Sequence, residues 1–114
     1  NTPNILWSRL ETWASFGVPD LIGYHSLCGF FMVELKIQTG NKIRFSPHQV
    51  LFHTTRNHRN YILVNQSPNA SRSSIKLYSS KNIQGLILDP REIKPLAVND
   101  WQLIENILIN KKNN

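Results

Sequence analysis

The chain has 114 residues, enough for one compact domain with a single core, and we treat residues 1–114 as that domain. Hydrophobic residues make up 40% of the sequence and charged residues 18%, which excludes a disordered tail, and no apolar run approaches the length of a membrane span. A single cysteine excludes an intrachain disulfide and a cysteine-rich zinc site, and it favours a reduced, intracellular and cytoplasmic setting. The net charge of +6 is typical of a domain that binds polyanions, nucleic acid above all.

The N-terminal half of the chain predicts a helix followed by a β-hairpin. Apolar residues at helical spacing predict a helix over residues 4–16. Residues 19–24 and 30–36 then predict two strands, and turn-forming residues between them predict that the strands pair as a hairpin. In the second of these strands Phe31, Val33 and Leu35 face one side, and Glu34 shares the other side with its alternate neighbours.

The remaining elements complete a mixed sheet with helices packed against it. Ser46 and Gln49 predict a capping box at the start of a second helix, which runs to about residue 56. Residues 61–65 and 75–79 predict two further strands, joined by a polar loop over 67–74. Residues 81–95 are ambiguous, and residues 100–109 predict a last helix with Asp100 as its N-cap, so the order is α-β-β-α-β-β-α.

One group of charged residues lies in the most strand-like part of the chain. Glu34 and Lys36 are two residues apart, so a strand places both side chains on the same face. Asp20 lies in the preceding strand, and the predicted hairpin lets it approach Glu34. Two carboxylates this close repel each other unless a divalent cation lies between them, and magnesium is the usual cation where phosphate is present. The alternative is a buried ion pair between Asp20 and Lys36 that only orders the sheet.

The spacing of these residues resembles the signature of the PD-(D/E)XK nucleases. Val18-Pro19-Asp20 is followed, fourteen residues after the aspartate, by Glu34-Leu35-Lys36. The wider context, which ends in Phe45-Ser46-Pro47-His48-Gln49, is similar to the VRR-NUC and Holliday-junction-resolvase-like branch. The resemblance covers residues 11–64 and implies an α/β fold with a restriction-endonuclease-like αβββαβ core.

The resemblance also implies roles for five side chains. Asp20 and Glu34 would be ligands of Mg²⁺, for which Mn²⁺ can substitute, and Lys36 would be the catalytic lysine. Glu11 would be a further metal ligand, although an exposed helix charge is an equal alternative. Gln49 would face the site as well as closing the capping box.

One departure from the family concerns the number of strands. Our prediction has two strands before the second helix, whereas the family usually has three. Either residues 37–45 extend the sheet, or residues 24–30 contain a tighter hairpin than the one we predict.

These observations favour a metal-dependent DNA endonuclease that recognises a junction, a flap or a nick. Phosphate contacts are expected from the basic residues that flank the motif, namely Lys42, Arg44, Arg56 and Arg59. The alternatives are a sequence-specific homing-type endonuclease, a basic nucleic-acid-binding domain without catalytic activity, and, for the four basic residues, an ordinary charged surface. His48 and His53 lie near the motif, and either phosphate contacts or solvated helix positions would account for them.

The large apolar residues favour a homodimer. Trp7 and Trp13 in the first predicted helix, and Trp101 in the last, exceed what one small core obviously needs. A remaining apolar patch would form an interface, and a two-fold pair would supply the two sites that cutting both strands requires. The alternative is that all three side chains fold into the core of one chain.

Overall fold

A computed structural model describes residues 2–10, 19–69 and 72–110, which form a mixed α/β structure around one seven-stranded sheet. The sheet order is β1-β2-β3-β5-β6-β7, and the short β4 pairs with β3. Only β3 and β5 are parallel, and every other neighbouring pair is antiparallel. The strands are β1 (Leu6–Arg9), β2 (Leu21–His25), β3 (Gly29–Thr39), β4 (Lys42–Ile43), β5 (Asn60–Asn69), β6 (Arg72–Ser79) and β7 (Ala97–Val98).

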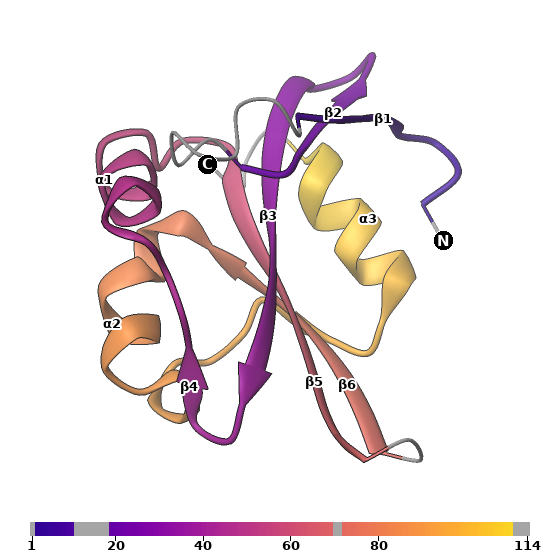
Figure 1. Cartoon of the computed structure of the whole chain (residues 1–114). Helices are drawn as coiled ribbons and strands as arrows, with labels where there is room; N and C mark the ends of the chain where they lie inside the picture. Colours follow the sequence, from indigo (N-terminus) through magenta and orange to yellow (C-terminus); the bar gives the residue numbers. More distant parts are fainter. Residues whose placement is uncertain (1, 11–18, 70–71, 111–114) are drawn as a thin grey trace.

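Three helices cover the two faces of the sheet (Figure 1). The helices α1 (Pro47–Thr55) and α2 (Ile83–Leu88) lie on one side, and α3 (Trp101–Ile109) lies on the other. The short 3-10 turns η2 (Ser80–Asn82) and η3 (Pro90–Glu92) flank α2, which resolves the ambiguous stretch 81–95. No helix in the described ranges is long and apolar enough to cross a membrane.

The first element is a strand where the sequence predicts a helix. Residues 6–9 form β1, which pairs antiparallel with β2, so the prediction of helix is wrong for these residues; residues 11–16 lie outside the described part. Exposure alternates here, since Ile5 and Trp7 turn toward the core and Leu6 is 73% exposed. The Trp7 ring meets Phe31 edge-on at 5.5 Å. Pairing with β2 and this contact outweigh the helical spacing of the apolar residues.

The predicted hairpin is confirmed, and its second strand is longer than predicted. Leu21 pairs with Val33, and the turn closes at Gly29, whose φ of 79° suits a residue without a side chain. β3 continues to Thr39, where a turn at Gly40 returns the chain as β4. The sheet therefore extends into residues 37–45, the first of the two alternatives left open by the sequence.

The elements after the hairpin agree more closely with the predictions from the sequence. Ser46 caps α1, and its capping box with Gln49 is present. Asp100 caps α3 through the backbone N–H of Leu103, as predicted. β5 and β6 occupy most of the region 67–74, where we predicted a polar loop, because cross-strand pairing continues through these polar residues.

Two apolar cores lie on opposite faces of the sheet. The first packs under α3 and contains Ile5, Phe31, Val33, Tyr61, Leu77, Ala97, Ile104 and Leu108. The second packs under α1 and α2 and contains Ile43, Ile62, Val64, Tyr78, Ile83 and Leu86. Trp7 and Trp101 pack against the first core, so much of their apolar surface is used within this chain. Trp13 lies outside the described residues, and the homodimer stays a prediction.

Candidate active site

The hairpin brings Asp20 and Glu34 together. β2 and β3 pair from Leu21 with Val33 onward, so the next position along each strand holds one of the two acids. Asp20 Oδ2 accepts a hydrogen bond from the backbone N–H of Leu35 at 2.9 Å, and its carboxyl group is close enough to that of Glu34 to raise the pKa of Glu34. The strand alternation of the sequence therefore predicts this pair correctly.

Glu34 is a buried acid with an unusual proton affinity. Its side chain is only 1% exposed. Burial first, and then the hydrogen bond and the charge repulsion from Asp20, raise its pKa to about 8 against the opposing charge of Lys36. At neutral pH Glu34 is therefore mostly protonated unless another cation takes the place of its proton.

The pair fits a divalent cation. The described residues include no group of three or more His, Cys, Asp or Glu side chains placed to hold a metal. Magnesium does not require one, since it is usually bound through one or two carboxylates together with phosphate oxygens and water. Glu34 Oε1 is buried, makes no hydrogen bond with any described residue, and lies 3.6 Å from His53 Nε2. Glu11, the predicted further ligand, lies outside the described residues.

Gln49 connects Glu34 to Lys36. Its side-chain Oε1 accepts a hydrogen bond from Lys36 Nζ at 2.7 Å and another from the backbone N–H of Ser46 at 2.9 Å. Its Nε2 donates to Glu34 Oε2 at 3.3 Å. The same side chain therefore closes the capping box of α1 and contacts Glu34 and Lys36 of β3, so the cap is confirmed and Gln49 faces the predicted site residues.

Lys36 is half-buried beside the carboxyl pair. Burial lowers the pKa of its ammonium group, and the charges of Glu34 and Asp20 oppose that shift without cancelling it. The ammonium lies 4.9 Å from the centre of the Phe45 ring, where a cation is favoured. Lys36 therefore has a defined position and a lowered proton affinity.

His53 and Ser80 adjoin the carboxyl pair; the sequence names His53 only as a residue near the motif and does not indicate Ser80. His53 is fully buried, with Nδ1 2.6 Å from Ser80 Oγ and Nε2 3.6 Å from Glu34 Oε1. Burial, with a smaller contribution from the charge of Lys36, lowers the pKa of His53 to about 4, so the ring is neutral at neutral pH. The tautomer with its proton on Nε2 suits both neighbours, because Ser80 then donates to Nδ1 and the ring N–H faces Glu34.

One signal could have found His53. It follows Gln49 by four residues on α1, so both side chains lie on the same face of that helix. The interpretation of His53 as a solvated position is wrong, whereas His48 is exposed. Ser80 lies on η2, a separate element, and no spacing in the sequence relates it to α1.

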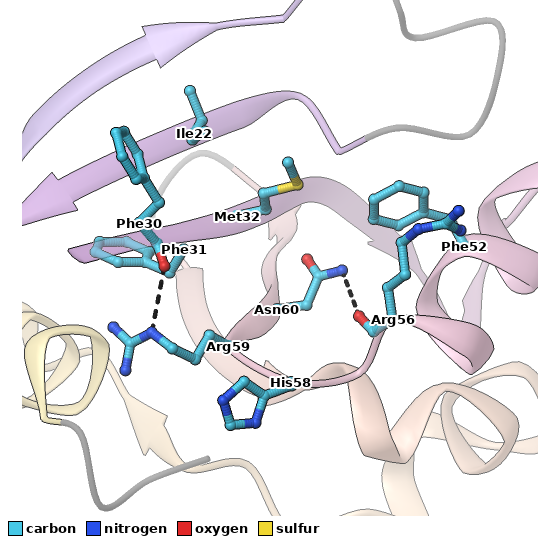
Figure 2. Close-up of a pocket in the computed structure, with 9 residues that line it drawn as sticks. All are labelled: Ile22, Phe30, Phe31, Met32, Phe52, Arg56, His58, Arg59 and Asn60. Atoms are coloured by element: carbon cyan, nitrogen blue, oxygen red, sulfur yellow. Dashed lines mark hydrogen bonds between the residues drawn. The ribbon is translucent and has the colours of Figure 1, made fainter. Parts of the chain in front are cut away.

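The predicted basic residues divide between two hollows. Lys42 and Arg44 are exposed, and together with Lys36 they line the basic hollow, a cavity of about 590 Å³. Arg56 and Arg59 line the aromatic hollow, a cavity of about 260 Å³ near the end of α1 (Figure 2). Arg59 Nε and Nη2 donate to the backbone carbonyls of Phe30 and Leu108, each at 3.2 Å, so its guanidinium also holds parts of the protein together.

Comparisons of the chain with models of protein families, with curated proteins and with solved structures find no match.

Proposed function

We propose that the protein is a magnesium-dependent endonuclease that hydrolyses phosphodiester bonds of DNA. The observation that carries the proposal is the proximity of Asp20, which directly precedes β2, to Glu34 on β3, where the Asp20 carboxyl helps to raise the pKa of the fully buried Glu34. Such a pair disfavours its own ionisation, and a buried charged group is a poor source of stability. A divalent cation between the two carboxylates removes the repulsion and gives the arrangement a use.

Magnesium is the cation that the donor set favours, with manganese as a substitute. Asp20 and Glu34 offer hard carboxylate oxygens, and phosphate oxygens and water would complete the coordination. Bound there, the cation would lower the pKa of a coordinated water and act as a Lewis acid toward the phosphate.

Other side chains near the carboxyl pair would supply the remaining requirements of phosphodiester hydrolysis. Lys36, held by Gln49, stands beside the carboxyl pair, where it can orient the attacking water and offset the negative charge that develops on the phosphate. His53 lies against the Oε1 face of Glu34 and limits how far that carboxyl can rotate. Lys42 and Arg44 in the basic hollow would position the phosphates next to the cleaved bond.

The topology supports a restriction-endonuclease-like core. β2, β3 and β4 precede α1, and α1 then leads to β5, which is parallel to β3. This run has the order βββαβ. If β4 corresponds to the family's third strand, two departures remain: β1 is an additional strand before this run, and the first helix has no counterpart in residues 2–10.

A cleavage panel tests the proposal. The protein is incubated with magnesium and linear duplex, nicked circle, flap, four-way junction and single-stranded DNA. We expect cleavage that requires magnesium or manganese, that stops with chelator, that prefers a junction, flap or nick, and that is lost in Glu34→Gln. A sequence preference on linear duplex would instead favour the homing-type alternative. Binding without cleavage of any substrate would identify a non-catalytic nucleic-acid-binding domain and reject the proposal.

A further inference from the structure

The aromatic hollow lies beside the candidate active site and has no role in the chemistry described above. It is bounded by the start of β3, the end of α1 and residues 58–60 (Figure 2). Met32 lines it and lies two residues before Glu34 on the same face of β3, a separation of roughly 7 Å along a strand. Phe52 lines it too, and precedes His53 on α1. A nucleic-acid strand with its cleaved phosphate at the carboxyl pair would therefore bring a neighbouring nucleotide to this hollow.

Asn60 places an unused hydrogen-bond acceptor in the hollow. Its side chain is only 4% exposed, and its Nδ2 donates to the backbone carbonyl of Arg56 at 2.8 Å, which determines the orientation of the amide. Its Oδ1 is buried and makes no hydrogen bond with any described residue. Figure 2 shows Oδ1 directed away from Arg56 and toward Met32, and both Asn60 and Met32 line the hollow. A buried acceptor without a partner is costly, and a ligand N–H would satisfy it.

Flat side chains and cations surround this acceptor. The Phe30 ring is 64% exposed, and the Tyr24 ring supports it at 4.9 Å. The Arg56 guanidinium lies 4.9 Å from the centre of the Phe52 ring, so a planar cation and an aromatic ring are presented together. Aromatic rings and guanidinium planes are the surfaces on which proteins stack single nucleobases, and Arg56 with His58 can also contact the phosphate of the same nucleotide.

We propose that the aromatic hollow binds one unpaired nucleobase next to the cleaved phosphate. The inference deepens the proposed endonuclease function, because it requires a substrate with a single-stranded segment, such as a flap. The volume of about 260 Å³ is below the roughly 300–1,000 Å³ of pockets that hold drug-sized ligands, so it suits a single base. Every base has an N–H on its Watson–Crick edge, and that edge is free only when the base is unpaired. The hollow therefore selects unpaired bases without selecting sequence.

Binding measurements in calcium, which we expect to occupy the metal site without supporting cleavage, test the stacking surface. Fluorescent single-stranded DNA and the matched duplex are titrated with the native protein, Phe30→Ala and Leu27→Ala. Leu27 is 65% exposed in the turn of the same hairpin and does not line the hollow, which makes it a matched control. Phe30→Ala should weaken single-strand binding about tenfold and leave duplex binding unchanged, and Leu27→Ala should change neither.

Modified oligonucleotides then locate the base. An abasic residue moved along the single strand should weaken binding by the native protein at one position, with no further loss in Phe30→Ala. At that position, unsubstituted purine in place of adenine should weaken binding several-fold, because it stacks but has no Watson–Crick N–H for Asn60 Oδ1. Equal losses on single strand and duplex, absence of any sensitive position, or no binding of single strand would overturn the proposal. Base-dependent binding without cleavage would leave this subsite standing and reject the nuclease.

Discussion

The side-chain oxygen of Gln49 accepts a hydrogen bond from the Lys36 ammonium at 2.7 Å, and this contact ties a helix cap to the candidate catalytic lysine. The other end of the same amide donates to Glu34 at 3.3 Å. One side chain of α1 therefore sets the spacing of two side chains of β3. Replacements that keep the cap and remove the donor can separate these functions.

Gln49→Glu should reduce cleavage without unfolding the protein. A glutamate still closes a capping box, but its second oxygen cannot donate to Glu34 and adds repulsion. We expect the single-turnover rate to fall about a hundredfold, the size of effect that a small displacement of reacting groups produces. His48→Glu is the matched control, because it adds the same charge at an exposed position of the same turn. Equal rates for the two variants would remove Gln49 from the site.

Stability of the metal-free protein should decline above pH 6.5. The pKa of Glu34 is raised from 4.5 to about 8, so between these values the folded state holds a proton that the unfolded chain has released, and the unfolding free energy falls as pH rises. The pKa of His53 is lowered from 6.5 to about 4, so its contribution rises with pH over that lower range. The two effects oppose each other below pH 6.5. Above it the effect of Glu34 dominates until Lys36 titrates, because the lowered pKa of Lys36 acts in the opposite direction.

Urea denaturation across this pH range measures the effect. The unfolding free energy should be nearly constant between about pH 4.5 and 6.5 and should fall from there to about pH 8. Glu34→Gln cannot ionise and should lack the decline, and added calcium should reduce it by favouring the charged pair. The same decline in the native protein and in Glu34→Gln would show that another group causes it.

Metal binding and cleavage should separate among the three central residues. Lys36→Met removes the cation that acts on water and phosphate but keeps both carboxylates, so we expect lost cleavage with nearly native manganese affinity. Asp20→Asn and Glu34→Gln should weaken both properties. Calorimetric titration with manganese measures the affinity, and cleavage is assayed in parallel. Native manganese affinity in Asp20→Asn, with affinity lost in Lys36→Met, would reverse the roles assigned here.

The salt dependence of DNA binding should show whether Lys42 and Arg44 contact phosphates. Lys42→Ala and Arg44→Ala should each reduce the slope of log affinity against log salt by about one, because each removes one phosphate contact. Lys94→Ala, an exposed lysine that lines neither hollow, is the control and should leave the slope unchanged. Binding is measured in calcium. Slopes that are unchanged in Lys42→Ala and Arg44→Ala would place the DNA surface elsewhere.

Arg59→Ala, unlike these variants, should lower the stability of the fold. Its guanidinium bonds the carbonyls of Phe30 and Leu108, which belong to β3 and α3, so its removal should lower the midpoint of thermal unfolding. The sequence shows only that a cation is present at this position. It cannot show that two backbone carbonyls far apart in the chain converge on that cation.

Local signals account for the parts of the site that the sequence predicted. The pairing of Asp20 with Glu34 follows from strand alternation and a short turn, and the position of Gln49 follows from a cap that requires only four consecutive residues. The strand at residues 6–9 depends on pairing with β2, which no local pattern encodes. The contact of His53 with Ser80 likewise joins separate elements. Sequence spacing could therefore indicate the position of His53, but not that of Ser80.

The burial of β3 and β5 on both faces has a consequence for how the proposed activity would be lost. Val33 faces the core under α3 while its neighbour Glu34 meets His53, and β3 pairs with β5 in the register of Glu34 with Ile62. A slip of one residue would exchange the two faces, placing the carboxyl in the apolar core and Val33 beside the histidine. A partly misfolded molecule therefore cannot retain a weakened site. Destabilising substitutions remote from the site should lower the active fraction of a preparation and leave the turnover of each active molecule unchanged.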